Sequence, residues 1–367
     1  MELVGNNLYA RVRGTVSTGL RAHLPPLLLL AVLFLAAMVL LDDSDERLSR
    51  DIGLLIGNLL GLLPFFLSGV GMIGLIWLAL ALRRGRPPGR ALRWIAGGNW
   101  PEILLLRIPL LIGLALATSY LYFTFKVNIA NFAPFTWDHF FAGIDRVLFL
   151  GHDPWALSHR LLPGVLATKI FDALYLIWYL ILLVSIFSVA VLPLRHPLRL
   201  SFLLALGLNW VIGGVVLAIL FPAAGPVYME RITGDPMFQP LMERLYGQAE
   251  GTRIMALEIQ EWLWDGYTRS DVDPAGIAAF PSLHVSIPAT CACLGFAVSR
   301  VTGWLATAFT LGILVGSVHL GWHYAIDGIA GIVLAILFWR ISARVTRWWL
   351  ARTEPERAEA AVAVAVN

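Results

Sequence analysis

Long hydrophobic stretches alternate with short polar segments along most of the chain. Eight stretches contain about 20 apolar residues each, which is the number that crosses the hydrocarbon core of a bilayer as an α-helix. They cover residues 24–41, 52–82, 103–125, 170–194, 201–220, 283–299, 303–319 and 324–341. The pattern therefore predicts an all-α, polytopic membrane helix bundle of about eight transmembrane helices.

The composition supports a membrane protein. Of the 367 residues, 58% are hydrophobic and 14% are charged, whereas a soluble domain averages roughly 45–50% and 25%. The net charge of +3 is small, and we expect no nucleic-acid partner. Cys291 and Cys293 lie two residues apart in an apolar run, where a helix would point them in different directions, so we interpret them as packing residues.

Basic residues predict how the helices are oriented. Sixteen Arg residues fall in the segments on the side of the N-terminus, and ten Lys or Arg residues fall on the opposite side, where the connecting segments are longer. Basic residues concentrate on the cytoplasmic side of a membrane. An even number of spans, with both termini in the cytoplasm, agrees with this rule.

Two histidines distant in sequence are predicted to lie at the same depth in the membrane. His284 begins the sixth apolar run, and sixteen residues lead from it to Arg300, a rise of roughly 24 Å at ~1.5 Å per residue. The seventh run returns a similar number of residues, to His319. His284 and His323 should therefore meet at the surface opposite the termini, although 39 residues separate them.

His323 and Asp327 are four residues apart in the segment Gly-Trp-His-Tyr-Ala-Ile-Asp-Gly. If this segment is helical, the two side chains share one face. Asp327 could then accept a hydrogen bond from one ring nitrogen of His323 and leave the other nitrogen free to attack a substrate. Ionisable groups at membrane depth are costly and often functional. The alternative is a buried polar pair that only locks two helices together.

The segment Phe280-Pro281-Ser282-Leu283-His284 predicts a helix start beside His284. Pro is common at the first position of a helix, and Ser is common at the N-cap. Free N–H groups at a helix N-terminus bind anions. The sequence therefore predicts a phosphate-sized site with an imidazole on either side.

Pro281-Ser282-Leu283-His284, followed by His323-x3-Asp327, resembles the second and third signature motifs of the type 2 phosphatidic acid phosphatase superfamily. The forms Phe-Pro-Ser-Leu-His and His-Tyr-x-x-Asp are most similar to the inositol phosphorylceramide synthase branch (the inositolphosphotransferase family), which more often transfers a phosphate-linked headgroup than hydrolyses it. The resemblance implies a six-helix catalytic core within residues 101–345. Residues 1–100 would form a two-helix membrane extension, and residues 346–367 a disordered tail.

The resemblance also implies a role for each motif residue. His323 attacks phosphorus and becomes a phosphohistidine, Asp327 orients His323, and His284 protonates the leaving oxygen. Ser282 and the amides around it hold the phosphate. No metal ion or other cofactor takes part. A covalent intermediate of this kind divides one difficult displacement into two easier ones.

The sequence departs from the superfamily pattern in each motif. Ser317 stands six residues before His323, where an Arg is usual, and Leu283 stands where a Gly is usual. The first motif, a Lys followed by Arg-Pro, is absent. Lys126 with Ala133-Pro134 has its spacing without the Arg, two spans before the expected place. Because a missing cation lowers transition-state stabilisation, a basic residue from a loop should reach the site.

Other residues are candidates for substrate contacts. The expected place of the first motif follows the fifth apolar run, where Tyr228 or Arg231 could reach a phosphate. Ser317 occupies the position of the missing Arg. His319 lies four residues before His323, so it either lines the same groove or packs between helices.

Three functions are consistent with these residues. The leading hypothesis is a transferase that moves a phosphate-linked headgroup from a phospholipid donor to a lipid alcohol in the bilayer. The alternative is a lipid phosphate phosphatase, which would use the same residues with water as the acceptor. The third is a transporter or scaffold with a vestigial site, against which the intact His284, His323 and Asp327 count. The donor, the acceptor and the oligomeric state stay open.

The Arg-rich, Lys-poor composition is associated with GC-rich bacterial genomes. We therefore expect a protein of the bacterial inner membrane whose active site faces the periplasm.

Overall fold

The structure is a computed structural model that describes residues 21–40, 103, 107–269 and 275–353. The predicted span 52–82 lies outside the described residues. So does most of the predicted N-terminal extension, and so does the predicted tail from residue 354 onward.

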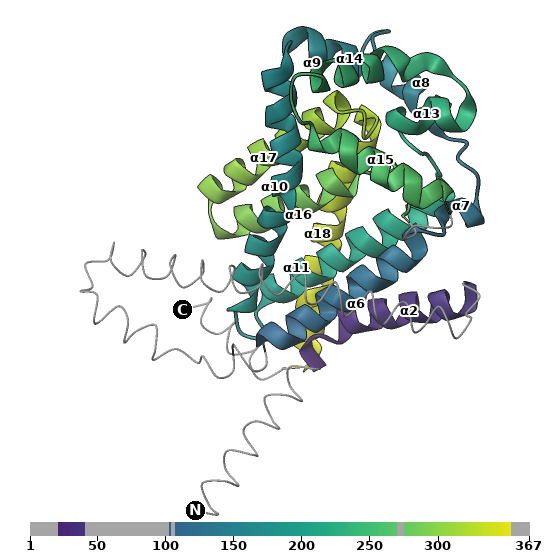
Figure 1. Ribbon diagram of the computed structural model, residues 1–367. Helices are drawn as coiled ribbons and strands as arrows, with labels where there is room; N and C mark the ends of the chain where they lie inside the picture. The colour runs from purple at the N-terminus through teal and green to yellow at the C-terminus, as the bar shows by residue number, and fades with distance from the viewer. Residues whose placement is uncertain (1–20, 41–102, 104–106, 270–274, 354–367) are drawn as a thin grey trace, which may run out of the picture. The chain divides into compact units, whose positions relative to one another are not determined.

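The described residues form helices and no strand, which confirms the predicted all-α class (Figure 1). In chain order the elements are α2 (Leu24–Leu40), α6 (Ile108–Lys126), α7 (Ile129–Phe132), α8 (Asp138–Leu148), α9 (Pro154–Leu161), α10 (Val165–Ala190), α11 (Pro197–Leu208), the π-helix η2 (Asn209–Leu217), α12 (Ala218–Leu220), α13 (Pro226–Thr233), the short 3-10 helix η3 (Pro236–Phe238), α14 (Gln239–Ala249), α15 (Met255–Thr268), α16 (Leu283–Val298), α17 (Arg300–His319) and α18 (Ala325–Thr353).

Four helical segments are long and apolar enough to cross a membrane. They are Val165–Ala190, Pro197–Leu220, Arg300–His319 and Ala325–Thr353. The predicted spans at 24–41, 103–125 and 283–299 correspond to shorter apolar helices. The described residues therefore contain four candidate membrane-spanning helices, and the predicted count of eight is not confirmed. α18 also continues to Thr353, inside the segment predicted to be a disordered tail.

The chain divides into two compact units. The first is Met1–Tyr120, Leu183–Leu204 and Ile341–Asn367, and the second is Leu121–Leu182 and Ala205–Arg340. Every residue that the sequence suggested for catalysis or substrate binding falls in the second unit.

In the first unit, the fully buried guanidinium of Arg199 binds backbone carbonyl groups. It donates to the carbonyls of Val189 at 3.2 Å, Ala190 at 2.9 Å and Arg107 at 3.0 Å, and its Nε–H donates to His23 Nε2 at 3.2 Å. The last carbonyls of a helix have no partner within the helix. Arg199 therefore satisfies the C-terminal end of α10.

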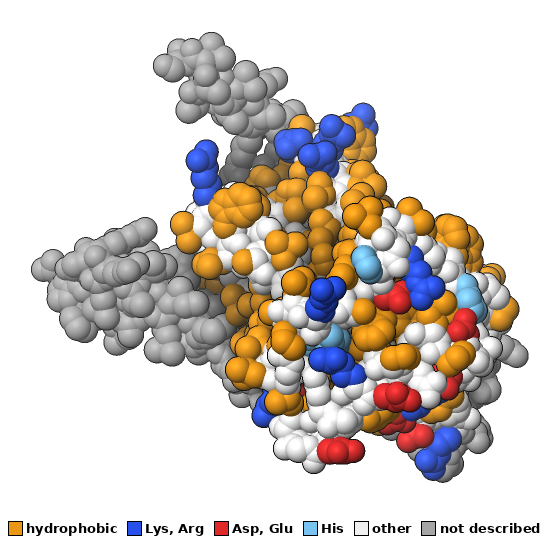
Figure 2. Space-filling model, turned by 90° about the horizontal axis from the view of Figure 1, so that it is seen from above, with side chains coloured by type: hydrophobic (Ala, Val, Ile, Leu, Met, Phe, Trp, Pro, Cys, Tyr) orange, Lys and Arg blue, Asp and Glu red, His pale blue; other side chains and the backbone are white. Residues whose placement is uncertain are grey.

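In the second unit, the short helices α8, α9, α13 and α14 gather at one end (Figure 1). A hydrophobic core joins them to the membrane-type helices, and it includes Phe141, Met229, Leu241, Val285 and Leu320. The outer face of the short helices carries acidic, basic and histidine side chains between hydrophobic ones, as Figure 2 shows. These helices therefore form a cap with a mixed surface over the ends of the longer helices.

Three buried aspartates join separate segments of the second unit. Each accepts hydrogen bonds from two consecutive backbone N–H groups of another segment, at distances between 2.7 and 3.0 Å. The pairs are Asp138 with Ala224 and Gly225, Asp145 with Ala325 and Ile326, and Asp172 with Met255 and Ala256. A carboxylate at a helix N-terminus satisfies free N–H groups and interacts favourably with the helix dipole. Asp145 stabilises the start of α18 in this way, and Asp172 the start of α15.

Gly225 gives a test of the loop that precedes α13. Its φ of +98° is unfavourable for residues with a side chain, and an added Cβ would lie 2.7 Å from the carbonyl oxygen of Trp322. Gly225→Ala should therefore lower the free energy of unfolding by about 1–3 kcal/mol, seen as a lower Tm of the detergent-solubilised protein.

Gly247→Ala is the matched control. Gly247 is an exposed residue of α14 with open space around its Cα, so the same substitution should raise stability by about 0.5–1 kcal/mol. Equal Tm values for the two variants would contradict the described loop conformation.

Candidate active site

His284 lies in the first turn of α16, enclosed by aromatic side chains of α10. The ring of Tyr175 stacks on it with a centroid distance of 4.4 Å, and Trp178 meets it edge-on at 4.8 Å. A ring packed between two aromatic neighbours has few orientations to choose from. The aromatic residues therefore fix the direction of the imidazole.

His323 and Asp327 meet at the start of α18 rather than along a helix. α17 ends at His319 and α18 begins at Ala325, so His323 lies in the connecting turn. The Asp327 carboxylate turns back and accepts the backbone N–H of Tyr324 at 3.0 Å, as in one half of a capping box. The same oxygen lies 3.5 Å from His323 Nδ1. The predicted pairing is present, and helix capping rather than a shared helix face produces it.

The α16–α17 hairpin brings the two histidines together as the sequence predicted. The centroids of the His284 and His323 rings are 6.1 Å apart, and the ring planes are inclined by 52°. Asp327 is fully buried and His323 is 6% exposed. Each imidazole also has a neighbour other than the second histidine. Tyr175 stacks on the His284 ring, and Asp327 faces Nδ1 of His323.

Ser282 immediately precedes α16 and connects the two halves of the site. Its backbone N–H donates to the carbonyl of Asp327 at 3.1 Å. Its hydroxyl oxygen is buried and has no hydrogen-bond partner among the described residues. A buried hydroxyl without a partner is unfavourable unless a ligand supplies one. Ser282 Oγ is therefore available for a substrate oxygen.

Lys126, the last residue of α6, is partly buried. Its ammonium lies 5.8 Å from the centroid of the Tyr122 ring and close enough to His284 for their charges to interact. A Cβ at Gly276 would overlap the Lys126 carbonyl, so that glycine lets the loop before α16 approach the lysine. No carboxylate pairs with Lys126 in the described part of the chain.

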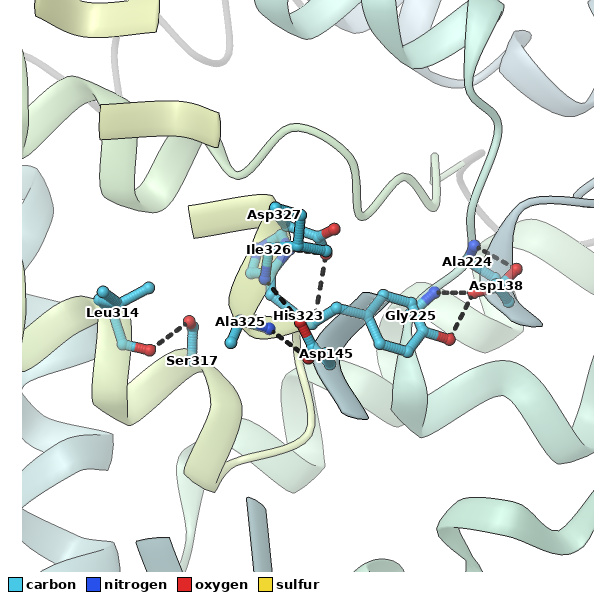
Figure 3. Close-up of polar contacts among 11 residues, drawn as sticks. Asp138, Asp145, Ala224, Gly225, Leu314, Ser317, His323, Ala325, Ile326 and Asp327 are labelled. Carbon is cyan, nitrogen blue, oxygen red and sulfur yellow. Dashed lines mark hydrogen bonds and ion pairs between the residues drawn. The ribbon is translucent and has the colours of Figure 1, made fainter. Parts of the chain in front are cut away.

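Helix α8 holds the segment that follows His323 through hydrogen bonds to Tyr324, Ala325 and Ile326 (Figure 3). Asp145 binds the first N–H groups of α18, two residues from Asp327. Asp138 accepts the hydroxyl of Tyr324 at 2.9 Å while it binds the loop of Gly225. We did not predict a role for either aspartate from the sequence. Their spacing of seven residues on one amphipathic helix was the available signal, because it places two acids on one face.

Tyr228 and Arg231, which we expected to contact phosphate, have partners elsewhere. The buried hydroxyl of Tyr228 donates to the carbonyl of Gln260 at 2.9 Å. The Arg231 guanidinium forms a bidentate ion pair with Glu261 and lies 5.2 Å from the centroid of the Trp264 ring. Both side chains are committed to α15, so we leave them out of the proposed site.

Ser317, another expected substrate contact, instead supports the catalytic turn. Its hydroxyl donates to the carbonyl of Leu314 at 2.8 Å, and the side chain is fully buried (Figure 3). Its own carbonyl accepts the backbone N–H groups of Trp322 at 2.9 Å and His323 at 3.3 Å. Ser317 thus holds the backbone of His323 and has no free hydroxyl proton for a ligand.

His319 packs between helices, which was one of the two expected alternatives. The Thr168 hydroxyl donates to Gln248 Oε1 at 2.7 Å, so it must accept from His319 Nε2–H at 2.9 Å. His319 Nδ1 then accepts the hydroxyl proton of Ser158 at 2.7 Å. Both ring nitrogens are occupied in the neutral form, and we leave His319 out of the proposed site.

The comparisons with known proteins agree with the motif resemblance at the level of the superfamily. Residues 139–341, more than half of the chain, match the model of the PAP2 superfamily. Neither a curated protein nor a solved structure matches the chain. The matched region contains His284, His323 and Asp327. As for metal ions, no three His, Cys, Asp or Glu residues are grouped so as to bind one within the described ranges.

The hydrogen bonds from the start of α18 to Asp145 of α8 can be tested through the pH dependence of stability. Burial raises the pKa of this carboxyl to about 6 and outweighs the two N–H donors, which act in the opposite direction. The unfolded chain ionises Asp145 near its ordinary pKa of 3.8. As pH rises from 4 to 6, ionisation therefore stabilises the unfolded state first, and the contribution of Asp145 to stability falls by roughly 2 kcal/mol.

The measurement is the Tm of wild type and Asp145→Asn from pH 4 to pH 7. The Tm of wild type should fall relative to the Tm of the variant as pH rises to about 6. Above that pH, the difference between the two Tm values should change little. Other carboxyl groups titrate in both proteins and cancel in the difference. A Tm difference that grows with pH would contradict the assigned environment of Asp145.

Proposed function

Because the chain belongs to the PAP2 superfamily, we propose that it transfers a phosphate-linked headgroup from a phospholipid to a lipid alcohol through a phosphohistidine intermediate. The superfamily acts on lipid phosphates as phosphatases and phosphotransferases. The four long apolar helices agree with a membrane enzyme of this type. The observation that carries the proposal is the 6.1 Å separation of the His284 and His323 rings, with Asp327 beside His323.

In the first step, His323 attacks the phosphorus of the donor lipid. Asp327 faces Nδ1, so Nε2 carries the lone pair that forms the P–N bond. The P–O bond to the donor lipid breaks, and His284 gives its proton to the departing oxygen. The His323 ring is cationic in the phosphohistidine, and the Asp327 carboxylate stabilises that charge.

In the second step, the acceptor lipid replaces the donor. Its hydroxyl group transfers a proton to His284, and its oxygen attacks phosphorus as the P–N bond breaks. His323 and His284 return to their starting protonation states. In the phosphatase alternative the donor is a phosphomonoester lipid, and water in place of the alcohol releases inorganic phosphate from the same phosphohistidine.

Ser282 and Lys126 form the proposed phosphate cradle. The unpartnered hydroxyl of Ser282 and the free N–H groups at the start of α16 suit phosphoryl oxygens. Lys126 is the proposed replacement for the cation that Ser317 lacks, since its ammonium has no carboxylate partner in the described residues and interacts with the charge of His284. A cation beside the phosphoryl group offsets the charge that develops in the transition state.

Two features support a lipid acceptor over water. The His284 ring is covered by Tyr175 and Trp178, which are apolar on the faces they present. The Phe280–His284 segment also has the form of the inositol phosphorylceramide synthase branch. An enclosed, apolar site excludes water from a reactive intermediate. We further propose that the protein lies in a bacterial inner membrane with its site facing the periplasm.

The direct test is to incubate purified protein with ³²P-labelled phospholipids, with phosphatidic acid as the phosphomonoester among them, with and without diacylglycerol or ceramide as acceptor. Transfer places label in a new lipid, and an acid-labile label remains on the protein when the acceptor is absent. His323→Ala should abolish both, with a loss of activity of roughly 10³-fold or more. Release of inorganic phosphate alone would establish the phosphatase alternative, and full activity of His323→Ala would refute both.

Lys126→Ala tests the proposed cradle. Loss of the cation should lower kcat by about 10²–10³-fold, as for removal of one donor from an oxyanion hole, and Lys126→Arg should restore part of the activity. Lys169→Ala is the control, because the only other lysine is exposed and donates to Thr252. Equal activity of the two alanine variants would exclude Lys126 from the site.

A further inference from the structure

Tyr175 is a buried tyrosine whose hydroxyl group makes no hydrogen bond within the described residues. The residue is 7% exposed, and its Oη has no hydrogen-bond partner among the described residues. Buried tyrosine hydroxyls normally find a partner, and one without a partner is unfavourable. A position that needs only packing would be filled better by phenylalanine. The hydroxyl therefore indicates a ligand.

The position of Tyr175 indicates where that ligand lies. Its ring stacks on His284, at 4.4 Å, and runs parallel to the ring of Trp322, at 5.7 Å and 2°. Trp322 directly precedes His323 in the chain. The Tyr175 hydroxyl is also close enough to Asp327 to be influenced by its charge. Tyr175 therefore lies between the two halves of the proposed catalytic site.

Trp322 is a second aromatic residue with a buried polar group that has no partner among the described residues. Its indole Nε1–H is buried and has no partner among the described residues. An indole N–H can only donate, so its missing partner must be an acceptor. A tyrosine hydroxyl is protonated at neutral pH, so it too can donate. The two rings thus present two neutral donors to one ligand that is rich in acceptor oxygens.

We propose that Tyr175 and Trp322 bind the non-bridging oxygens of the phosphoryl group while it is transferred between donor, His323 and acceptor. The inference rests on the proposed function and adds two substrate-binding residues to it. The transferred phosphate carries two non-bridging oxygens beside the ester oxygen of its headgroup, and donors placed at those oxygens stabilise the charge on them in the transition state. Even with Lys126 as its proposed cation, the cradle lacks the several N–H donors of a guanidinium at Ser317 and the close backbone approach of a glycine at Leu283. Neutral donors from α10 and from the turn before His323 fill that gap.

The test uses Tyr175→Phe and Trp322→Phe, which keep an aromatic ring and remove the donor. Each should lower kcat/KM for headgroup transfer by about 10–10³-fold, the range for loss of one oxyanion donor. Neither should lower the Tm of the substrate-free protein, because each removes a buried polar group that has no partner.

Tyr228→Phe is the matched control with the opposite expectation. Tyr228 is also buried, but its hydroxyl has a partner in the Gln260 carbonyl and lies outside the proposed site. This variant should lower Tm and leave kcat/KM unchanged. The crossed pattern separates a hydroxyl that binds substrate from one that holds the fold together.

A second measurement is independent of turnover. Inorganic phosphate should raise the Tm of His323→Ala, and the phosphate concentration needed should be about tenfold higher when Tyr175→Phe or Trp322→Phe is added, as for loss of one hydrogen bond to an anion. Unchanged phosphate affinity together with unchanged kcat/KM would overturn the inference and leave the proposed function intact. Loss of phosphate affinity in a protein that transfers no label would overturn the proposed function and retain the phosphate site.

Discussion

The start of α18 is the point on which the site depends. A helix N-terminus exposes backbone N–H groups that need acceptors, and here two carboxylates supply them from different directions. Asp145 of α8 binds the N–H groups of Ala325 and Ile326, and Asp327 turns back to bind that of Tyr324. Because Asp327 is held in this way, its carboxylate faces His323. Helix capping and orientation of the proposed nucleophile are thus the same interaction.

The hairpin and the paired histidines could be predicted because they depend on local connections. α16 and α17 are separated by a single residue, Ser299, so a helix leaving one membrane surface must return to it. The helix start at Ser282 follows from the same kind of local rule, since proline and serine have strong preferences at helix N-termini. Depth in the membrane then follows from counting residues along each helix.

The supporting contacts could not be predicted because they join distant segments. Asp138 binds Gly225 and Asp145 binds Ile326, which lie 87 and 181 residues away. Nothing in the local pattern of α8 identifies those partners. The partner of Arg231 could not be predicted for the same reason, since its guanidinium forms an ion pair with Glu261 on α15. Charged side chains in loops have many potential partners, and only the folded structure decides among them.

The presence of Ser317, where the superfamily usually has an arginine, agrees with the apolar surroundings and the neutral donors of the rest of the site. At this fully buried position the serine hydroxyl turns back to its own helix, and the serine carbonyl holds the turn of His323. A guanidinium there would bring a permanent charge into an apolar, aromatic site, where desolvation is costly. Besides the proposed cation Lys126, the donors around the histidines that have no partner among the described residues include those of Ser282, Tyr175 and Trp322, and these three are neutral. Neutral donors gain strength in a site of low dielectric without that desolvation cost, which suits a reaction in which two lipids exchange one phosphoryl group away from water.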